Sequence, residues 1–229
     1  MSDNKSSTES LEAIRKTIRT EVAEDTPAIR AKYLEHFGPQ VEEFCDAMTA
    51  AYIAWRKLDA QSKDKESAYV SALVFAAINS TAVSMRLLIN GHQSAAGAIQ
   101  RQALETVALA VLCTSRSLGI MSRFMKGTYS TNKAIRDLLR NTAQLELSDV
   151  GVRALADSRD FFNAFSHPSR LSLATLTSFS GEGLYLGSAF DSGKLAAYRK
   201  EISTRVSLAS LLSNIIVGIQ DGRRAERTP

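Results

Sequence analysis

Apolar residues recur at steps of three and four positions along most of this chain, a spacing that predicts amphipathic α-helices rather than strands. Gly38 and Pro39 interrupt the pattern early, and Gly127 interrupts it again later, so a helix is expected to end at each point. The expected helical segments are 11–22, 27–37, 40–58, 69–89, 90–116, 118–126, 132–145, 148–166 and 192–221.

The two segments 69–89 and 90–116 are the most continuously apolar, and only Asn90-Gly91 separates them. Such a short turn predicts an antiparallel pair of helices, with Gly91 ending the first helix in a left-handed conformation. The small residues of 94–98 would allow a neighbouring backbone to approach closely. This central hairpin is the predicted spine of the fold.

Between the last two helices, 175–179 and 184–187 are rich in β-branched and aromatic residues and flank Gly181-Glu182-Gly183. This pattern predicts a small β-hairpin. The fold class is therefore mainly α: an antiparallel helical bundle around a central helix hairpin, with a small β-hairpin before the last helix. The expected organisation is a disordered lead-in at 1–9, one helical domain at 10–222 and a basic tail at 223–229.

Composition agrees with helices, since only 7% of the residues are aromatic and 4 are proline. The net charge of +4 permits nucleic-acid binding without demonstrating it. Cys45 and Cys113 are far apart in apolar helical patterns, so we expect two buried thiols in a reducing compartment. The N-terminus lacks the pattern of a secretory signal, and the uncharged run 67–85 contains several polar residues, which favours a buried helix over a membrane span. We therefore expect a cytoplasmic protein without membrane contact.

Arg101 and Glu105 lie one helical turn apart within the apolar segment 90–116, so they are expected to form a largely buried ion pair. His167 precedes Pro168, which disfavours an α conformation before it, so His167 should lie at the end of its helix. The phenylalanines at 161, 162 and 165 would press that helix against the spine. We predict a ligand pocket formed by Arg101, Glu105 and His167, although a purely structural ion pair explains the same residues.

A second cluster is basic. Lys126, Lys133, Arg136 and Arg140 fall on one stretch of two short helices and are the best candidates for contact with nucleic-acid phosphates. The alternative is a solvated helix face without a ligand.

The chain lacks the phosphate-binding loop, the dinucleotide-binding glycine pattern, the H-E-x-x-H zinc motif and the nucleophile elbow of hydrolases. Its cysteines and histidines do not have the spacing of metal ligands. No cofactor and no metal site are therefore predicted.

Two motifs together resemble a known group. The R-x-x-x-E of Arg101 to Glu105, followed by a helix ending in S-H-P-S at 166–169, resembles an uncharacterised bacterial family of helical proteins. That family is similar to the HEPN superfamily (higher eukaryotes and prokaryotes nucleotide-binding). The resemblance covers roughly residues 68–220 and implies a helical fold that pairs into a homodimer, an expectation that the wide apolar face of the last helix also supports.

HEPN ribonucleases carry an arginine, often followed by a polar residue, and then a histidine, with four to six residues between the arginine and the histidine. The resemblance thus implies catalytic roles for Arg159 and His167, with Asn163 at the position where the nearer family has a serine. Seven residues separate Arg159 from His167 here, one more than that pattern allows.

Two functions follow from these residues. The first is a non-catalytic module, in a setting such as bacterial defence, that binds a partner protein, a nucleic acid such as RNA, or a small ligand in the pocket of Arg101, Glu105 and His167. The second is a metal-independent ribonuclease of toxin or defence type, in which His167 acts as general acid or base and an arginine stabilises the phosphate charge. Whether the chain is an enzyme is left open by the sequence.

Overall fold

The computed structural model describes residues 11–225, with side chains described as far as Asp221. Within this part the chain forms helices and no strand, which confirms the mainly α prediction. The predicted lead-in at 1–9 lies outside the described residues. The α-helices are α1 (Leu11–Ala23), α2 (Pro27–Ala60), α3 (Lys65–Ile89), α4 (Gln93–Leu112), α5 (Ile120–Met125), α6 (Ala134–Arg140), α7 (Asp149–Ser166), α8 (Arg170–Leu176) and α9 (Leu195–Ala225).

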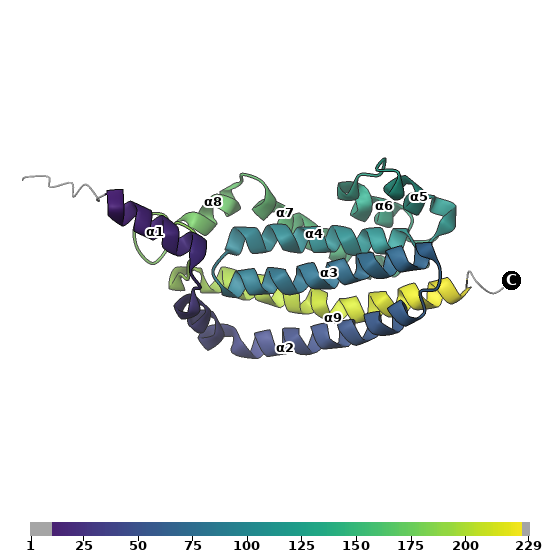
Figure 1. The fold of residues 1–229 in the computed structure, drawn as a ribbon, viewed down its shortest axis with the longest axis horizontal. Helices are drawn as coiled ribbons and strands as arrows, with labels where there is room; N and C mark the ends of the chain where they lie inside the picture. Colours follow the sequence, from purple (N-terminus) through teal and green to yellow (C-terminus); the bar gives the residue numbers. More distant parts are fainter. Residues whose placement is uncertain (1–10, 226–229) are drawn as a thin grey trace, which may run out of the picture.

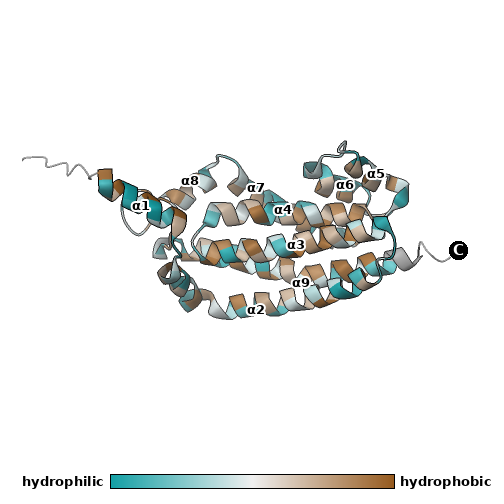
Figure 2. Ribbon diagram, viewed as in Figure 1, coloured by the Kyte–Doolittle hydropathy of each residue, from teal (hydrophilic) through white to brown (hydrophobic). Residues whose placement is uncertain are grey.

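Four long helices, α2, α3, α4 and α9, lie side by side along the molecule, and α5 to α8 lie over α4 (Figure 1). Hydrophobic residues are concentrated along the long helices (Figure 2). The helix α1 extends from one end and contributes no buried side chain. It is fastened there by the Glu21 carboxylate, which accepts hydrogen bonds from the backbone N–H and the hydroxyl of Ser188.

The turn between α3 and α4 forms as predicted. Gly91 has a φ of 87°, and the N–H of His92 donates to the carbonyl of Leu87, which closes the last turn of α3. The small residues at the start of α4 do admit a close neighbour, but at Gly97 it is a side chain and not the predicted backbone, because a Cβ there would lie 2.5 Å from the ring of Phe165. The helix α7 therefore packs onto α4 at a position where any side chain larger than the hydrogen of glycine would clash with Phe165.

The last helix does not run antiparallel to every neighbour. Tyr198, near the start of α9, packs on Tyr33 near the start of α2, with ring centroids 4.9 Å apart. Near the other end, the amide of Gln220 donates to the carbonyl of Ala54. The two helices therefore run in the same direction, because the chain returns to its starting end before α9 begins.

The predicted break at 38–39 is wrong, since α2 continues through Pro39 and curves along its length (Figure 1). A proline ring normally clashes with the Cβ of the preceding residue when that residue is helical. Gly38 has no Cβ and thus allows the helix to continue. A second boundary is also wrong, because α9 passes Gly222 and extends to Ala225.

The predicted β-hairpin is not present among the described residues. Only one antiparallel bridge forms, between Thr177 and Leu184, and α8 includes the residues expected to start the first strand. The loop instead packs around Lys194, a residue that is 5% exposed. Its ammonium lies 5.3 Å from the ring centroid of Phe179 and 5.2 Å from that of Tyr185. Burial lowers the pKa of Lys194, while the nearby carboxylate of Asp191 opposes that shift. Cation–aromatic contacts therefore replace the expected strand pairing.

The interior contains a fully buried ion pair, Glu201 and Arg205, whose side chains are 1% and 0% exposed. Their N···O distance is 3.1 Å, one helical turn apart in α9. Arg205 also donates to the hydroxyl of Ser84 in α3 and lies 4.8 Å from the ring centroid of Phe162 in α7. Glu201 accepts from the amide of Gln93 at the start of α4. One charged pair thus contacts three other helices.

Burial raises the pKa of the Glu201 carboxyl and lowers the pKa of the Arg205 guanidinium, whereas their mutual attraction opposes both shifts. The wide apolar face of α9 surrounds this pair and is consumed by the interior, with Ile202, Ile216 and Ile219 all buried. That face therefore gives no support to a dimer.

By length and composition, α3 and the segment Ser192–Asp221 could each cross a membrane. Core helices satisfy the same criterion, and both segments contribute buried side chains. Several polar residues of α3 favoured a buried helix over a membrane span in the sequence. Among them, Ser71, Thr81 and Ser84 are buried.

The two cysteines were predicted to be buried thiols. The prediction is confirmed for Cys113, which is buried, and wrong for Cys45, which is exposed on α2.

Glu201→Ala is expected to lower the free energy of unfolding by about 3 to 5 kcal/mol, because it leaves the Arg205 guanidinium buried without its counter-ion. Urea denaturation measures this quantity. Glu43→Ala, which removes an exposed carboxylate from α2, is the control and should change the value by less than about 0.5 kcal/mol. Equal effects of the two substitutions would contradict the role assigned to the buried pair.

Candidate functional site

The candidate site lies where α4 and the C-terminal half of α7 meet, and α4 supplies Arg101 and Glu105 from successive turns. The helix α7 is capped at its start by Ser148, whose hydroxyl accepts from the N–H of Gly151, and it ends at Ser166. His167 follows with φ −132° and ψ 154°, the extended conformation that Pro168 imposes. The prediction that this histidine lies at the helix end is confirmed.

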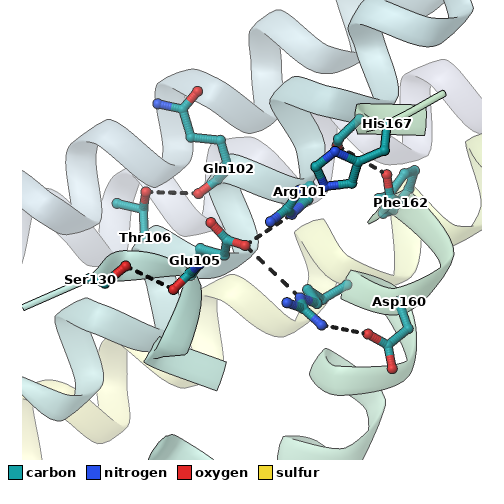
Figure 3. A network of polar contacts seen from close by, with 11 residues as sticks. Arg101, Gln102, Glu105, Thr106, Ser130, Asp160, Phe162 and His167 are labelled. Atoms are coloured by element: carbon teal, nitrogen blue, oxygen red, sulfur yellow. Dashed lines mark hydrogen bonds and ion pairs between the residues drawn. The ribbon is translucent and has the colours of Figure 1, made fainter. Parts of the chain in front are cut away.

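Arg101 and Glu105 are paired as predicted, with Nε and Oε1 3.0 Å apart and side chains 16% and 12% exposed. His167 is exposed, and its Nε2 lies 3.1 Å from Nη1 of Arg101. Figure 3 shows Arg101 reaching the Glu105 carboxylate with one part of its guanidinium and His167 with another. The histidine is therefore in contact with the arginine of the pair.

The direction of this hydrogen bond determines the state of the imidazole. A guanidinium can only donate, so Nε2 of His167 must accept through its lone pair. The tautomer that fits this contact has its N–H at Nδ1. The lone pair that a general base would use is thus already engaged by Arg101.

Arg159 joins the cluster from α7. Its Nε is 3.9 Å from the same Glu105 oxygen that holds Arg101, and its Nη1 donates to Asp160 over 2.8 Å. Glu105 therefore lies between two arginines. Two guanidinium groups and two carboxylates balance to zero charge, so the cluster offers little net attraction for a phosphate.

Asn163, the remaining residue predicted for catalysis, is half-buried on α7, and the structure gives no contact that links it to His167. His167 has left the helical conformation, so a separation of four residues no longer places the two side chains on one helix face. The structure thus joins Arg101, Glu105, Arg159 and His167 through hydrogen bonds and ion pairs.

The predicted basic face is exposed at all four residues, Lys126, Lys133, Arg136 and Arg140. Asp137 lies 3.8 Å from both Arg136 and Arg140 and also accepts from the hydroxyl of Tyr129. Two of the four cations therefore share one carboxylate, which reduces the positive field of this face.

Comparison with known proteins gives no assignment, since neither the family models nor the curated proteins nor the solved structures contain a match to this chain. Within residues 11–225, no three His, Cys, Asp or Glu side chains lie together in an arrangement suited to a metal ion.

Sequence reasoning missed two features. The Glu201–Arg205 pair has the same four-residue spacing within an apolar helix as Arg101 and Glu105, so that signal was present in the sequence. The second feature is a cavity of about 540 Å³ at the other end of α7. Its walls come from segments distant in sequence, and no local pattern indicates it.

Glu105→Ala is expected to cost about 1 to 3 kcal/mol of unfolding free energy, since two arginines lose a shared acceptor whose side chain is mostly but not fully buried. The matched control is Gln102→Ala on an exposed position of the same helix, with a change below about 0.5 kcal/mol. Chemical denaturation of both variants decides the point. A Glu105 variant as stable as the control would show that the pair is not structural.

Proposed function

We propose that this protein is a non-catalytic, HEPN-like helical bundle that serves as an interaction module, built on the α3–α4 hairpin and acting as a homodimer in the cytoplasm. The contact from Arg101 to Nε2 of His167 carries the proposal. A ribonuclease histidine needs a free nitrogen lone pair or an acidic N–H directed at substrate, together with an uncompensated positive charge for the phosphate. Here the Nε2 lone pair is engaged, and both arginines are balanced by carboxylates.

The surface proposed for interaction is the outer face of α3. Between Glu66 and Arg86 this helix has no charged residue, and its exposed positions include Phe75 and Val83, which are 42% and 38% exposed. Aromatic side chains extend the surface onto α2, since the ring centroid of Trp55 lies 4.7 Å from that of Phe75 and 5.2 Å from that of Tyr52. Exposed aromatic residues surrounded by small uncharged ones are typical of an interface centre.

A second copy of the chain is the partner that suits this surface. The protein has a net charge of +4, so two copies repel each other wherever charged faces meet. An uncharged face avoids that repulsion, and a twofold axis would place one Phe75 near the other. The HEPN resemblance implies the same assembly.

The wild-type chain is expected to be a dimer at tens of micromolar concentration, and Phe75→Glu a monomer with an unchanged circular dichroism spectrum, because the new carboxylates would face each other across the axis. Size-exclusion chromatography with light scattering measures the mass. Leu173→Glu, at a residue 63% exposed on α8, is the control that should remain dimeric. A monomeric wild type, or a dimer that survives Phe75→Glu, would contradict the proposed interface.

The ribonuclease alternative is supported by the exposure of His167 beside two arginines. A labelled single-stranded RNA incubated with the full chain and a metal chelator distinguishes the two functions. We expect no cleavage beyond that seen with His167→Ala, and the two proteins should unfold at similar urea concentrations because this histidine is exposed. Cleavage by the wild type that His167→Ala removes at unchanged stability would overturn the non-catalytic proposal.

A further inference from the structure

Positive charge is concentrated in one part of this chain. Residues 116–145 carry a net charge of +5 from one acidic residue, Asp137, and six basic residues: Arg116, Arg123, Lys126, Lys133, Arg136 and Arg140. The whole chain carries +4, so the remaining residues together are slightly acidic. The segment contains α5 and α6, which lie together over one end of α4 (Figure 1). We call it the basic lobe.

Tyr129 connects the two helices of the basic lobe. The Arg123 guanidinium of α5 lies 5.4 Å from the Tyr129 ring centroid, and the Tyr129 hydroxyl donates to Asp137 of α6 over 3.0 Å. The same carboxylate lies 3.8 Å from both Arg136 and Arg140. Three arginines from two helices therefore converge around one tyrosine and one carboxylate.

This carboxylate does not neutralise the outer surface of the lobe. The Asp137 side chain is 19% exposed, whereas those of Arg136 and Arg140 are 55% and 67% exposed, so the cations project beyond the anion. Arg116 is paired with Glu66 of α3. The cations of the lobe that form no ion pair with another residue of the described range 11–221 are Arg123, Lys126 and Lys133. The surface that faces solvent is therefore positive.

The lobe has no exposed aromatic side chain on which a base could stack. Its two aromatic residues are Phe124, which is half-buried, and Tyr129, which is 8% exposed. Proteins that bind single strands commonly combine cations with exposed aromatic rings. A duplex keeps its bases stacked and presents about one phosphate charge per 1.7 Å of its axis, so cations alone suffice to hold it. The lobe therefore suits a duplex better than a single strand.

A membrane surface is a weaker match to the same cations. Short helices that bind a membrane insert a continuous apolar face between the lipids. The large apolar residues that the lobe exposes are Met125 and Leu139, which lie on different helices. The exposed residues between these helices are polar, with the hydroxyl of Thr131 and the amide of Asn132 as further donors for phosphate oxygens.

We propose that the basic lobe binds the phosphate backbone of a nucleic-acid duplex, without reading its base sequence. Arg123, Lys126 and Lys133 contact the phosphates directly, and Arg136 and Arg140 add to the attraction. This partner goes beyond the dimer interface proposed above and does not depend on it. It places the attraction for phosphate on the lobe and not at the charge-balanced cluster around Glu105.

Fluorescence anisotropy of a labelled 20-base-pair duplex, titrated with the full chain at several salt concentrations, tests the proposal. The wild type should bind at about 50 mM salt and lose affinity as salt rises, because each phosphate contact releases counter-ions. The triple variant Lys126→Gln, Lys133→Gln, Arg140→Gln should bind about tenfold more weakly or worse and show a shallower dependence on salt. Its mass and its circular dichroism spectrum should equal those of the wild type, since all three residues are exposed.

The matched control removes the same number of charges from the other end of the molecule. Arg15→Gln, Lys16→Gln, Arg19→Gln changes three exposed cations of α1, which lies far from the lobe (Figure 1). Exposed charges beyond about 10 Å are screened at 0.1 M salt, so the control should change affinity by less than about twofold. Equal losses in the two triple variants would show that only net charge matters and would overturn the proposal.

Asp137→Asn supplies a test by gain of affinity. The substitution removes the negative charge of the lobe while the new amide oxygen still accepts from the Tyr129 hydroxyl. Duplex binding should become about threefold tighter or more, because two arginines lose a competing carboxylate. Unchanged or weaker binding by the folded variant contradicts the assigned surface.

The choice of probes tests the class of partner. A DNA duplex and an RNA duplex share the backbone chemistry, so binding of either supports the proposal and the tighter one identifies the source. No duplex binding at about 50 mM salt, or tighter binding of the single strand, overturns it. Binding to phosphatidylserine vesicles in place of the duplex also overturns it. Because Phe75 lies on α3 outside the lobe, failure of the dimer test leaves this test intact, and the reverse also holds.

Discussion

The rest of the structure depends on one constraint, the burial of a carboxylate and a guanidinium from α9. Charges removed from water must be paired and hydrogen-bonded, and each remaining polar atom requires a partner at a defined place. Glu201 and Arg205 meet most of this need through Gln93 of α4 and Ser84 of α3, and the one atom without a hydrogen-bond partner is Nη2 of Arg205. Ser84 in turn donates to the carbonyl of Ala96 in α4. Apolar packing alone would tolerate small shifts between these helices, whereas this network requires one register.

The same network positions the candidate site. The Arg205 guanidinium lies over Phe162, and Phe165 in the next turn of α7 packs against Gly97 of α4. These contacts fix α7 against α4, and the position of α7 brings Arg159 and His167 to the pair on α4. The cluster at the surface is therefore explained as a consequence of helix packing, which agrees with a structural role for its charges better than with catalysis.

Helical periodicity made most of the fold predictable, because a 3.6-residue pattern is local. The turn at Gly91 and the end of α7 before Pro168 were also predictable, since each depends on one residue's conformational limits. The continuous α2 was not, because the effect of Pro39 depends on the missing Cβ of Gly38. The hairpin prediction failed because α8 continues to Leu176, through the start of the predicted first strand, and the aromatic side chains that follow pack on Lys194, which lies outside the predicted hairpin. At the site, i,i+4 spacing predicted the Arg101–Glu105 pair, but spacing cannot show which member of the pair the histidine meets.

A double-mutant cycle on Glu201→Leu and Arg205→Met tests the constraint most directly, with urea denaturation as the measurement. If the pair acts as one unit, each single variant leaves a buried charge and is destabilised, whereas the double variant leaves none. The account predicts that the double variant is at least as stable as either single variant, with a coupling free energy of about 2 kcal/mol or more. Single-variant costs that add to within about 0.5 kcal/mol would contradict it, because independent sites behave in that way.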